Sequence, residues 1–227
     1  MEPGCYSAAI AAVRQDFVIE FATTSQQLEE AFRLRHQVYC LERNFEPGED
    51  GLERDEYDPL ASHIILRDRH TGQVIGTVRL VVPALHGSIV VLPMERVASL
   101  PRLHQLPRER LAEVSRFALS KCQRAASGTL GALLRLCLIR GIVQLSGEMG
   151  LTHWCALMEP KLLRLLQTSA IYFQQISGMV DHHGLRQPSC IGLAEMLDRV
   201  RCEKPAVWDF ITDHGELWQP ERFDIAA

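Results

Sequence analysis

An acidic segment at residues 50–58 is the first part of this sequence whose side chains could do chemistry. It reads DGLERDEYD and is followed closely by the apolar run HIIL. Carboxylates gathered in this way are most often solvated in a surface loop. They can also pair with cations that the fold buries, because a buried charge must be compensated. The choice between the two depends on whether the rest of the chain places cations in its core.

Two arginines stand where the apolar pattern places the core. Arg35 lies one helical turn from Phe32 and Tyr39, on the face that an amphipathic helix would bury. Arg79 lies in the apolar run GTVRLVV, which is typical of a central strand. Taken singly, Arg35 could extend its head group to solvent, and Arg79 could form a salt bridge to a neighbouring strand.

A third arginine, Arg116, follows Glu113 in the sheet-like run AEVSRF. Strict alternation along a strand would put these two charges on opposite faces. A β-bulge between them would bring both to one site, and bulges are common beside active sites. The alternative is a structural ion pair at a sheet edge.

Together, the acidic segment and the arginines predict a single ion network. We expect Arg35 and Arg79 to hold Asp55 and Asp58 in place, while Arg54 and Glu56 face water. This interpretation is favoured over a solvated loop because several inward charges need partners at once.

The elements that position these residues follow from apolar spacing and turn signals. Thr24 and Gln27 form a capping box that opens a helix running to about Glu42. The turn-rich stretch RHTGQ between two apolar runs predicts an antiparallel hairpin. The other expected elements are a short helix within 92–100, strands at 17–22, 111–120, 152–158 and 171–177, and helices at 129–147, 159–170 and 191–201. This order predicts one mixed α/β domain over residues 17–227, with a central sheet covered by helices, after a flexible lead-in at residues 1–16.

The composition argues against several classes of protein. The 227 residues carry a net charge of -4, which gives no reason to expect nucleic acid. Arginines interrupt the longest apolar runs, so we expect no membrane span, and we see no pattern of an export signal. Seven cysteines without a C-x-x-C pair argue against zinc and a disulfide framework, and favour a reducing cytoplasm.

The stretch MVDHHGLRQPS holds the other side chains that could bind a metal, Asp181, His182 and His183. Adjacent histidines on a strand point to opposite faces and rarely share an ion. We therefore predict no metal site and interpret this stretch as a loop that lines a pocket or closes over it.

The motifs LRHQVYC, GLERDEYD, SHIIL, VIGTVRLV and AEVSRFALS, in this order over residues 25–125, resemble the acyl-homoserine-lactone synthase superfamily. GLERDEYD and HHGLRQP are most similar to its N-acyl amino acid synthases and to acyltransferases associated with PEP-CTERM/exosortase systems. The resemblance implies a GNAT-like α/β fold, with a central, mixed, mostly antiparallel sheet flanked by helices. It also implies an acyl thioester donor, usually carried on acyl carrier protein, and an amine acceptor.

The resemblance also implies roles for single residues. Tyr39 and Phe45 fall where the family has aromatic residues near the acceptor pocket. Homoserine-lactone synthases usually carry Phe and Trp at these two positions, which argues against homoserine lactone as the product. The residues that match the family's charged positions are Arg35, Asp55, Asp58, Arg79, Glu113 and Arg116.

Acyl transfer to an amine requires a base, an oxyanion site and a binding group for the acceptor. Glu113 is the candidate general base, directly or through water, unless it is only a structural partner of Arg116. Backbone N–H groups of Phe117 and Ala118, freed at a bulge, could stabilise the oxyanion. Arg116 is the candidate for binding an acceptor carboxylate. No permanently bound cofactor is needed.

The donor is expected to be acyl-ACP rather than acyl-CoA. Coenzyme-A-dependent GNAT enzymes resemble one another in a Gln/Arg-x-x-Gly-x-Gly/Ala loop that holds the pyrophosphate at a helix N-terminus. Here the corresponding stretch, QRAASGTLGALL, has its glycines at 128 and 131, with the spacing stretched. Basic residues nearby could instead meet an acidic carrier protein: Lys121, Arg124, Arg135 and Arg140.

The sequence therefore predicts an N-acyltransferase that moves a fatty acyl group to an amino acid or a related small amine. An acyl-homoserine-lactone synthase is the alternative among enzymes. A catalytically silent GNAT-like sensor of acyl chains or carrier protein is the alternative of another class. The complete set of charged positions argues against the sensor.

Overall fold

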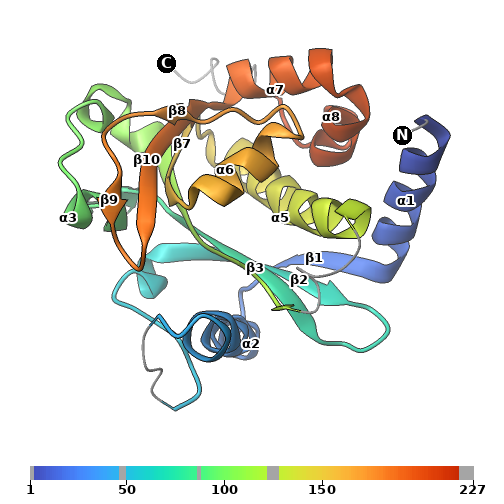
Figure 1. Cartoon of the computed structure of the whole chain (residues 1–227), viewed down its shortest axis with the longest axis horizontal. Coiled ribbons are helices and arrows are strands. Elements are labelled where there is room, and N and C mark those ends of the chain that lie inside the picture. The colour runs from blue at the N-terminus through green and yellow to red at the C-terminus, as the bar shows by residue number, and fades with distance from the viewer. Residues whose placement is uncertain (1–2, 46–49, 86–87, 122–127, 220–227) are drawn as a thin grey trace. The chain divides into compact units, whose positions relative to one another are not determined.

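The computed structural model describes residues 3–45, 50–85, 88–121 and 128–219. Figure 1 shows the helices and strands along the chain. They form two compact units, the first made of Met1–Arg79 and Arg116–Ile142 and the second of Leu80–Ser115 and Val143–Ala227. Strands β3 (Val74–Val81) and β6 (Leu111–Leu119) and helix α5 (Gly128–Met149) each continue from one unit into the other.

The first unit contains neighbouring strands in the order β1 (Phe17–Phe21), β2 (Ala61–Asp68), β3 and the end of β6. Strands β1 and β2 pair antiparallel, from Phe17 opposite Asp68 to Phe21 opposite Ile64. The predicted hairpin between β2 and β3 is confirmed by its turn, in which the Gly72 N–H donates to the Asp68 carbonyl.

Helices cover both faces of β1 and β2. Side chains alternate along a strand, so Ile64 and Arg67 of β2 face opposite ways. Gly141 of α5 lies so close to Ile64 and Ile19 that a Cβ there would clash. Arg67 instead donates to Glu30 of helix α2 at 2.7 Å. Helices α5 and α2 therefore pack on opposite faces of these strands.

Helix α2 (Ser25–Arg35) begins at the predicted capping box. The Thr24 hydroxyl accepts a hydrogen bond from the Gln27 N–H, and the Gln27 side chain accepts one from the Thr24 N–H. After Arg35 the helix continues as the π-helix η1 (His36–Glu42), so the predicted end near Glu42 is confirmed. Short π-helical segments occur frequently at functional sites.

The second unit contains the first part of β6, then β7 (His153–Met158), β10 (Leu185–Gly192) and β8 (Gln174–Gln175) as neighbours in this order. β6 pairs with β7 in parallel, whereas β10 pairs antiparallel with β7, with β8 and with β9 (Val180–Asp181). The chain thus has the mixed, mostly antiparallel sheet flanked by helices that the resemblance implied.

The remaining elements are short. They are α3 (Pro93–Val97), α6 (Pro160–Gln167), α7 (Leu193–Glu203), α8 (Pro205–Thr212), the strands β4 (Ala84–Leu85) and β5 (Ser88–Ile89), and 3-10 turns at Asp58–Leu60, Leu103–Gln105 and Arg108–Arg110. The sequence predicted α3, α6 and α7 but not α8, and it gave the two-residue strand β8 a longer range.

Strand β10 corrects the expectation of a loop at the end of MVDHHGLRQPS. Pro188, in the middle of β10, argues against a strand because it cannot donate a backbone hydrogen bond. Its backbone faces β8 rather than β7, and its carbonyl accepts from the Ile176 N–H at 3.1 Å. The proline therefore removes no bond between β10 and β7.

Residues 3–16, expected as a flexible lead-in, form helix α1 (Pro3–Asp16). Alanines at 8, 9, 11 and 12 favour a helix, and Val13 is buried. The weak apolar periodicity of the segment gave no signal of this helix. The expectation of one domain over 17–227 stays a prediction beside the two compact units.

Within the described residues, helix α5 is the one helix long and apolar enough to cross a membrane by length and composition. Its most apolar window has a mean hydropathy of 1.4, and 56% of that window is buried inside the protein. A core helix passes the same test, and the sequence had predicted an apolar helix at 129–147.

Candidate active site

The carboxylate of Asp58 lies at the centre of a buried ion cluster in the first unit. Arg35 donates to it through both terminal nitrogens, Nη1 to Oδ1 at 2.7 Å and Nη2 to Oδ2 at 3.0 Å. Arg79 Nη1 donates to the same Oδ1 at 2.7 Å. The side chains of Arg35, Arg79 and Asp58 are at most 5% exposed. This carboxylate is therefore held by two guanidinium groups away from solvent.

Arg116 completes the cluster through two further carboxylates. Its Nε donates to Glu53 Oε1 at 2.9 Å and its Nη2 to Asp55 Oδ2 at 2.8 Å. Glu53 also accepts from Arg35, and Asp55 also accepts from Arg79. Three arginines and three carboxylates thus form one connected set, in which the formal charges cancel.

The acidic segment is folded so that its carboxylates face the arginines. Asp58 Oδ2 accepts from the Asp55 N–H at 2.7 Å, and Asp55 Oδ1 accepts from the Tyr57 N–H at 2.9 Å. The Glu53 N–H donates to the carbonyl of Phe32 in α2 at 3.1 Å. The neighbouring side chains of Arg54 and Glu56 are exposed. The segment is therefore tied to α2 by its backbone and to β3 and β6 by its charges.

The arginines keep the carboxylates ionised. Burial alone would raise the pKa of Asp58, but the hydrogen bond and charge of Arg35 outweigh it and hold that pKa well below its usual range. Burial and Arg79 act in the same way on Asp55, whose pKa is also lowered. Burial opposes the charge of Arg116, but Glu53 and Asp55 outweigh it and raise the pKa of this arginine.

The cluster opens to solvent on the side of Arg116 and Asp55. Their side chains are 28% and 25% exposed, against 10% or less for the other members. A substrate in solution could therefore meet one guanidinium and one carboxylate, backed by the buried part of the cluster.

Tyr39 and Phe45 lie beside this opening. Their rings stack at a centroid distance of 6.1 Å, with 20° between the planes. The Arg116 guanidinium lies 5.9 Å from the centre of the Tyr39 ring. Burial raises the pKa of Tyr39, so its hydroxyl stays protonated at neutral pH. The structure thus brings the two predicted aromatic residues to the exposed arginine.

Arg116 has a left-handed backbone conformation inside strand β6, with φ 51°. This conformation is uncommon for a residue with a side chain and is found at bulges that reset strand alternation. The anomaly lies between Glu113 and Phe117, next to the position where a bulge was expected. Such strain persists only where the surroundings enforce it, which here are the carboxylates of Glu53 and Asp55.

The proposed oxyanion donors follow directly after this anomaly. Phe117 is half-buried, and Ala118 is buried against Leu34 and Val38 of the helical segment. The backbone at Ala118 is therefore held by packing on α2 and η1.

Glu113 belongs to the second unit, where its side chain is buried. Its Oε2 accepts a hydrogen bond from the Met94 N–H of α3 at 2.9 Å. It stands opposite Cys155 in the parallel pairing of β6 with β7. Its carboxylate is therefore held in place by the backbone of α3.

Glu53 and His63 belong to the cluster but were not predicted. Glu53 stands two residues before Asp55 in the acidic segment, and this spacing was the available signal. His63 Nε2 lies 3.2 Å from the Asp58 carbonyl oxygen, and its ring contacts Phe32 edge to face. Within the described residues its buried Nδ1 has no hydrogen-bond partner. Burial lowers the pKa of His63, so the imidazole is neutral at pH 7.

Much of the expected donor loop lies outside the described residues, including Arg124. Of the other basic residues named for this role, Lys121 is exposed, and its N–H donates to Glu42 at 3.1 Å. Arg135 and Arg140 are half-buried on α5. Burial lowers the pKa of Arg135.

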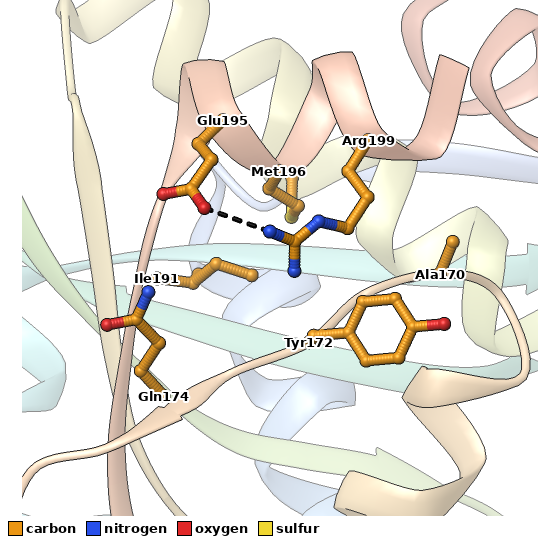
Figure 2. A pocket seen from close by; sticks show the side chains of 7 residues that line it. All are labelled: Ala170, Tyr172, Gln174, Ile191, Glu195, Met196 and Arg199. Atoms are coloured by element: carbon orange, nitrogen blue, oxygen red, sulfur yellow. Dashed lines mark hydrogen bonds and ion pairs between the residues drawn. The ribbon is translucent and has the colours of Figure 1, made fainter. Parts of the chain in front are cut away.

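A hollow in the second unit contains none of the predicted site residues. Figure 2 shows it beneath the Glu195–Arg199 ion pair of α7, with Ile191 and Met196 behind and Tyr172 at its edge. It measures about 210 Å³ including space open to solvent. Arg199 pairs with Glu195 at 3.0 Å and lies over the Tyr172 ring. Because its charged groups already satisfy one another, we assign it no chemistry.

His182 and His183 correct one detail of the sequence analysis. They lie in the turn between β9 and β10 rather than on a strand, and their rings are 4.5 Å apart. They therefore do not point to opposite faces. Still, no group of three metal-binding side chains is found in the part of the chain that the structure describes.

Residues 34–133, which include the cluster from Arg35 to Arg116, match the model of the acetyltransferase (GNAT) domain family. A comparison with curated protein sequences found no match. Over these residues the chain is thus similar to a GNAT acetyltransferase domain, and this match together with the fold indicates an acyltransferase. The GNAT-like fold that the sequence predicted is confirmed.

Several solved structures share this fold. The acyl-homoserine-lactone synthase LasI superposes with a TM-score of 0.60 and 18% identity, covering 78% of this chain and 89% of LasI. BjaI, a CoA-dependent acyl-homoserine-lactone synthase in complex with SAM and isopentyl-CoA, has a TM-score of 0.61 and 20% identity over 82% of this chain and 88% of its own. FeeM, an N-acyl amino acid synthase from uncultured soil microbes, has a TM-score of 0.57 and 17% identity over 81% and 93%.

Replacing Arg35 with alanine tests the buried cluster. Arg35→Ala leaves the carboxylates of Asp58 and Glu53 buried with fewer partners, so we expect the free energy of unfolding to fall by about 3–5 kcal/mol. Chemical denaturation measures this loss. Arg33→Ala on the same helix is the control, because its pair with Glu29 is exposed and contributes at most about 0.5 kcal/mol. Equal losses in the two variants would contradict the cluster.

His63 predicts a dependence of stability on pH. Its folded pKa lies below its ordinary value, so the unfolded state binds more protons once the pH falls below about 6.5. Stability from this group is therefore complete above that pH and is lost on acidification, by up to about 1.4 kcal/mol per pH unit. Denaturation between pH 7 and pH 5 should show a smaller loss for His63→Gln. His70→Gln should not show a smaller loss, because the hydrogen bond to Asp16 raises the pKa of this exposed histidine, which opposes the loss of stability on acidification. If His63→Gln lost as much stability between pH 7 and pH 5 as the wild type, His63 would not be the source of the pH dependence.

Proposed function

We propose that this protein transfers a fatty acyl group from an acyl thioester to the amine of an amino acid or a related small amine, giving an N-acyl amino acid. The observation that carries the proposal is the buried ion cluster within the match to a GNAT domain. In the part of the chain that the structure describes, this cluster opens to solvent at Arg116 and Asp55. This opening combines a guanidinium and a carboxylate, the groups that complement the two charges of an amino acid.

The acceptor binds at the opening, with its carboxylate on Arg116 and its side chain beside Tyr39 and Phe45. Arg116 Nε and Nη2 already donate to Glu53 and Asp55, so the acceptor meets the remaining nitrogen rather than a free two-pronged guanidinium. Arg35, Arg79, Asp55 and Asp58 support Arg116 and do not react. This arrangement keeps the binding group in place before the acceptor arrives.

In the reaction, Glu113 takes the proton of the acceptor ammonium, directly or through water. The neutral nitrogen attacks the thioester carbon, and the oxyanion that forms is stabilised by the N–H groups of Phe117 and Ala118. The C–N bond forms, the C–S bond breaks, and the carrier thiol leaves with a proton. The left-handed backbone at Arg116 supports this role, because it sets the direction of the amides that follow.

The acyl donor is a thioester on acyl carrier protein in preference to coenzyme A, and no cofactor is bound permanently. The stretched glycine spacing at 128 and 131 and the basic residues Lys121, Arg135 and Arg140 support this preference. BjaI, which shares the fold, is CoA-dependent, so acyl-CoA is the second donor to test. The reaction takes place in a reducing cytoplasm.

An acyl-homoserine-lactone synthase is the second candidate, supported by the shared fold of LasI and BjaI. Tyr39 and Phe45 favour the N-acyl amino acid product, because homoserine-lactone synthases resemble one another in Phe and Trp at these positions. The likeness to acyltransferases of PEP-CTERM/exosortase systems is a separate prediction, and the neighbouring genes test it.

The test is to incubate the purified protein with acyl-ACP or acyl-CoA and with a mixture of amino acids or S-adenosylmethionine, and to identify products by mass spectrometry. We expect N-acyl amino acids from acyl-ACP. Acyl-homoserine lactone would support the second candidate instead. No product from any combination would overturn acyl transfer and favour a sensor.

Glu113→Gln should retain the fold and lose acyl transfer, because an amide can still accept the Met94 hydrogen bond but cannot take a proton. General bases contribute about 10²- to 10⁴-fold, so the steady-state rate should fall within this range while the melting temperature changes little. Glu109→Gln, at an exposed glutamate near the start of the same strand, is the control. A wild-type rate in Glu113→Gln would remove this residue as the base.

A further inference from the structure

A row of three sulfur- and oxygen-bearing side chains crosses the sheet of the second unit. Glu113 of β6 stands opposite Cys155 of β7, and Cys155 stands opposite Cys190 of β10. Residues opposite one another on paired strands direct their side chains to the same face. The thiols of Cys155 and Cys190 are therefore neighbours, and Cys155 is also a neighbour of Glu113.

The hydrogen-bond pattern of β7 and β10 shows that the two cysteines form a close pair. The Leu193 N–H donates to the Thr152 carbonyl at 2.8 Å, which makes these two residues a hydrogen-bonded pair. Such pairs alternate along antiparallel strands, so Cys190 and Cys155, three positions further along, form a non-hydrogen-bonded pair. Pro188, another two positions along, falls in the same class, as its missing N–H requires.

Non-hydrogen-bonded pairs have the shortest Cα separation in an antiparallel ladder, about 4.5 Å. Disulfides span Cα separations of about 4.4–6.8 Å. A bond between Cys155 and Cys190 therefore fits the backbone without moving either strand. Both cysteines carry free thiols in this structure.

The two thiols differ in access. Cys155 is fully buried, and its Sγ lies 3.6 Å from the Ala112 carbonyl oxygen of β6, to which it donates. Cys190 is half-buried. Burial raises the pKa of both thiols, and the charge of Glu113 adds to this effect at Cys155. Both groups are therefore protonated at neutral pH, so the pair reacts slowly with an oxidant.

We infer that Cys155 and Cys190 are the site of a reversible cross-strand disulfide, formed in the folded protein by a peroxide. Cys190, as the more accessible thiol, loses its proton and attacks one peroxide oxygen, which breaks the O–O bond and gives a sulfenic acid and water. Cys155 then displaces the sulfenic oxygen as a second water, and the S–S bond forms. Two thiols and one hydrogen peroxide thus give one disulfide and two waters. A small thiol reductant reverses the step.

The disulfide also changes the surroundings of Glu113, and this consequence rests on the proposed function. To reach Cys190, the Cys155 sulfur must turn away from the Ala112 carbonyl of β6 and toward β10. The Cys155 thiol then no longer donates to the carbonyl that precedes Glu113, and its electrostatic interaction with the Glu113 carboxylate changes. Oxidation should therefore lower acyl transfer, and reduction should restore it.

The test treats the folded wild type with hydrogen peroxide, blocks the remaining thiols, digests without reductant and identifies linked peptides by mass spectrometry. Tryptic peptides 141–161 and 187–199 contain Cys155 and Cys190 as their only cysteines. We expect these two peptides to be linked, with the mass of two hydrogen atoms lost, and to separate after reduction. Cys202→Ala should form the same link, because Cys202 is exposed on α7 and belongs to another element.

The inference would be overturned if the folded wild type formed no linked peptides. It would also be overturned if the link formed only after the protein was unfolded. Cys190→Ser should form no link, and its acyl transfer should survive a peroxide dose that lowers the wild-type rate by about tenfold or more. If the link forms while even the reduced protein transfers no acyl group, the disulfide stands and the proposed function fails. The two conclusions are thus tested separately.

Discussion

The carboxylate of Asp58, buried between the guanidinium groups of Arg35 and Arg79, determines how the rest of the first unit is arranged. A single buried charge would be costly, and removing any partner leaves another charge without compensation. The acidic segment must therefore fold back on α2, and β3 must carry an arginine where a central strand would otherwise be apolar. Glu53 and Asp55 extend the same compensation to Arg116, so the exposed end of the cluster is fixed by its buried end.

This constraint links stability to the proposed chemistry. Arg116 is positioned by two carboxylates and adopts a left-handed backbone inside β6, immediately before the amides of Phe117 and Ala118. A strained conformation of this kind persists because the surroundings determine it. Glu113, on the same strand, is held independently by a backbone N–H of α3. In the proposed reaction, acceptor binding and proton removal thus depend on different supports, so a variant should be able to lose one without the other.

Much of this could be predicted from the sequence, because buried arginines interrupt clear apolar patterns. Arg35 and Arg79 are charged residues at positions that the apolar pattern assigns to the core. Such charges need partners, and the nearby aspartates therefore indicated an ion network. Glu53 was missed because a carboxylate in an acidic run gives no such signal, and His63 because a histidine next to an apolar strand usually packs without further role. Strand β10 was missed because a proline within a strand removes a backbone hydrogen bond. Whether Pro188 removes one depends on which neighbouring strand its backbone faces. The pairing of Cys155 with Cys190 depends on that same strand, so no inspection of the sequence could reveal it.

The central claim is that the buried end of the cluster keeps Asp58 ionised inside the protein. The most direct measurement is the carbon-13 chemical shift of the Asp58 carboxyl group, followed by NMR as the pH is lowered. The account predicts that this signal does not titrate at any pH at which the protein remains folded, because Arg35 and Arg79 hold the pKa far below its usual range. A transition near pH 4, the value of an ordinary aspartate, would show that the carboxylate is not held by the two arginines and would contradict the account.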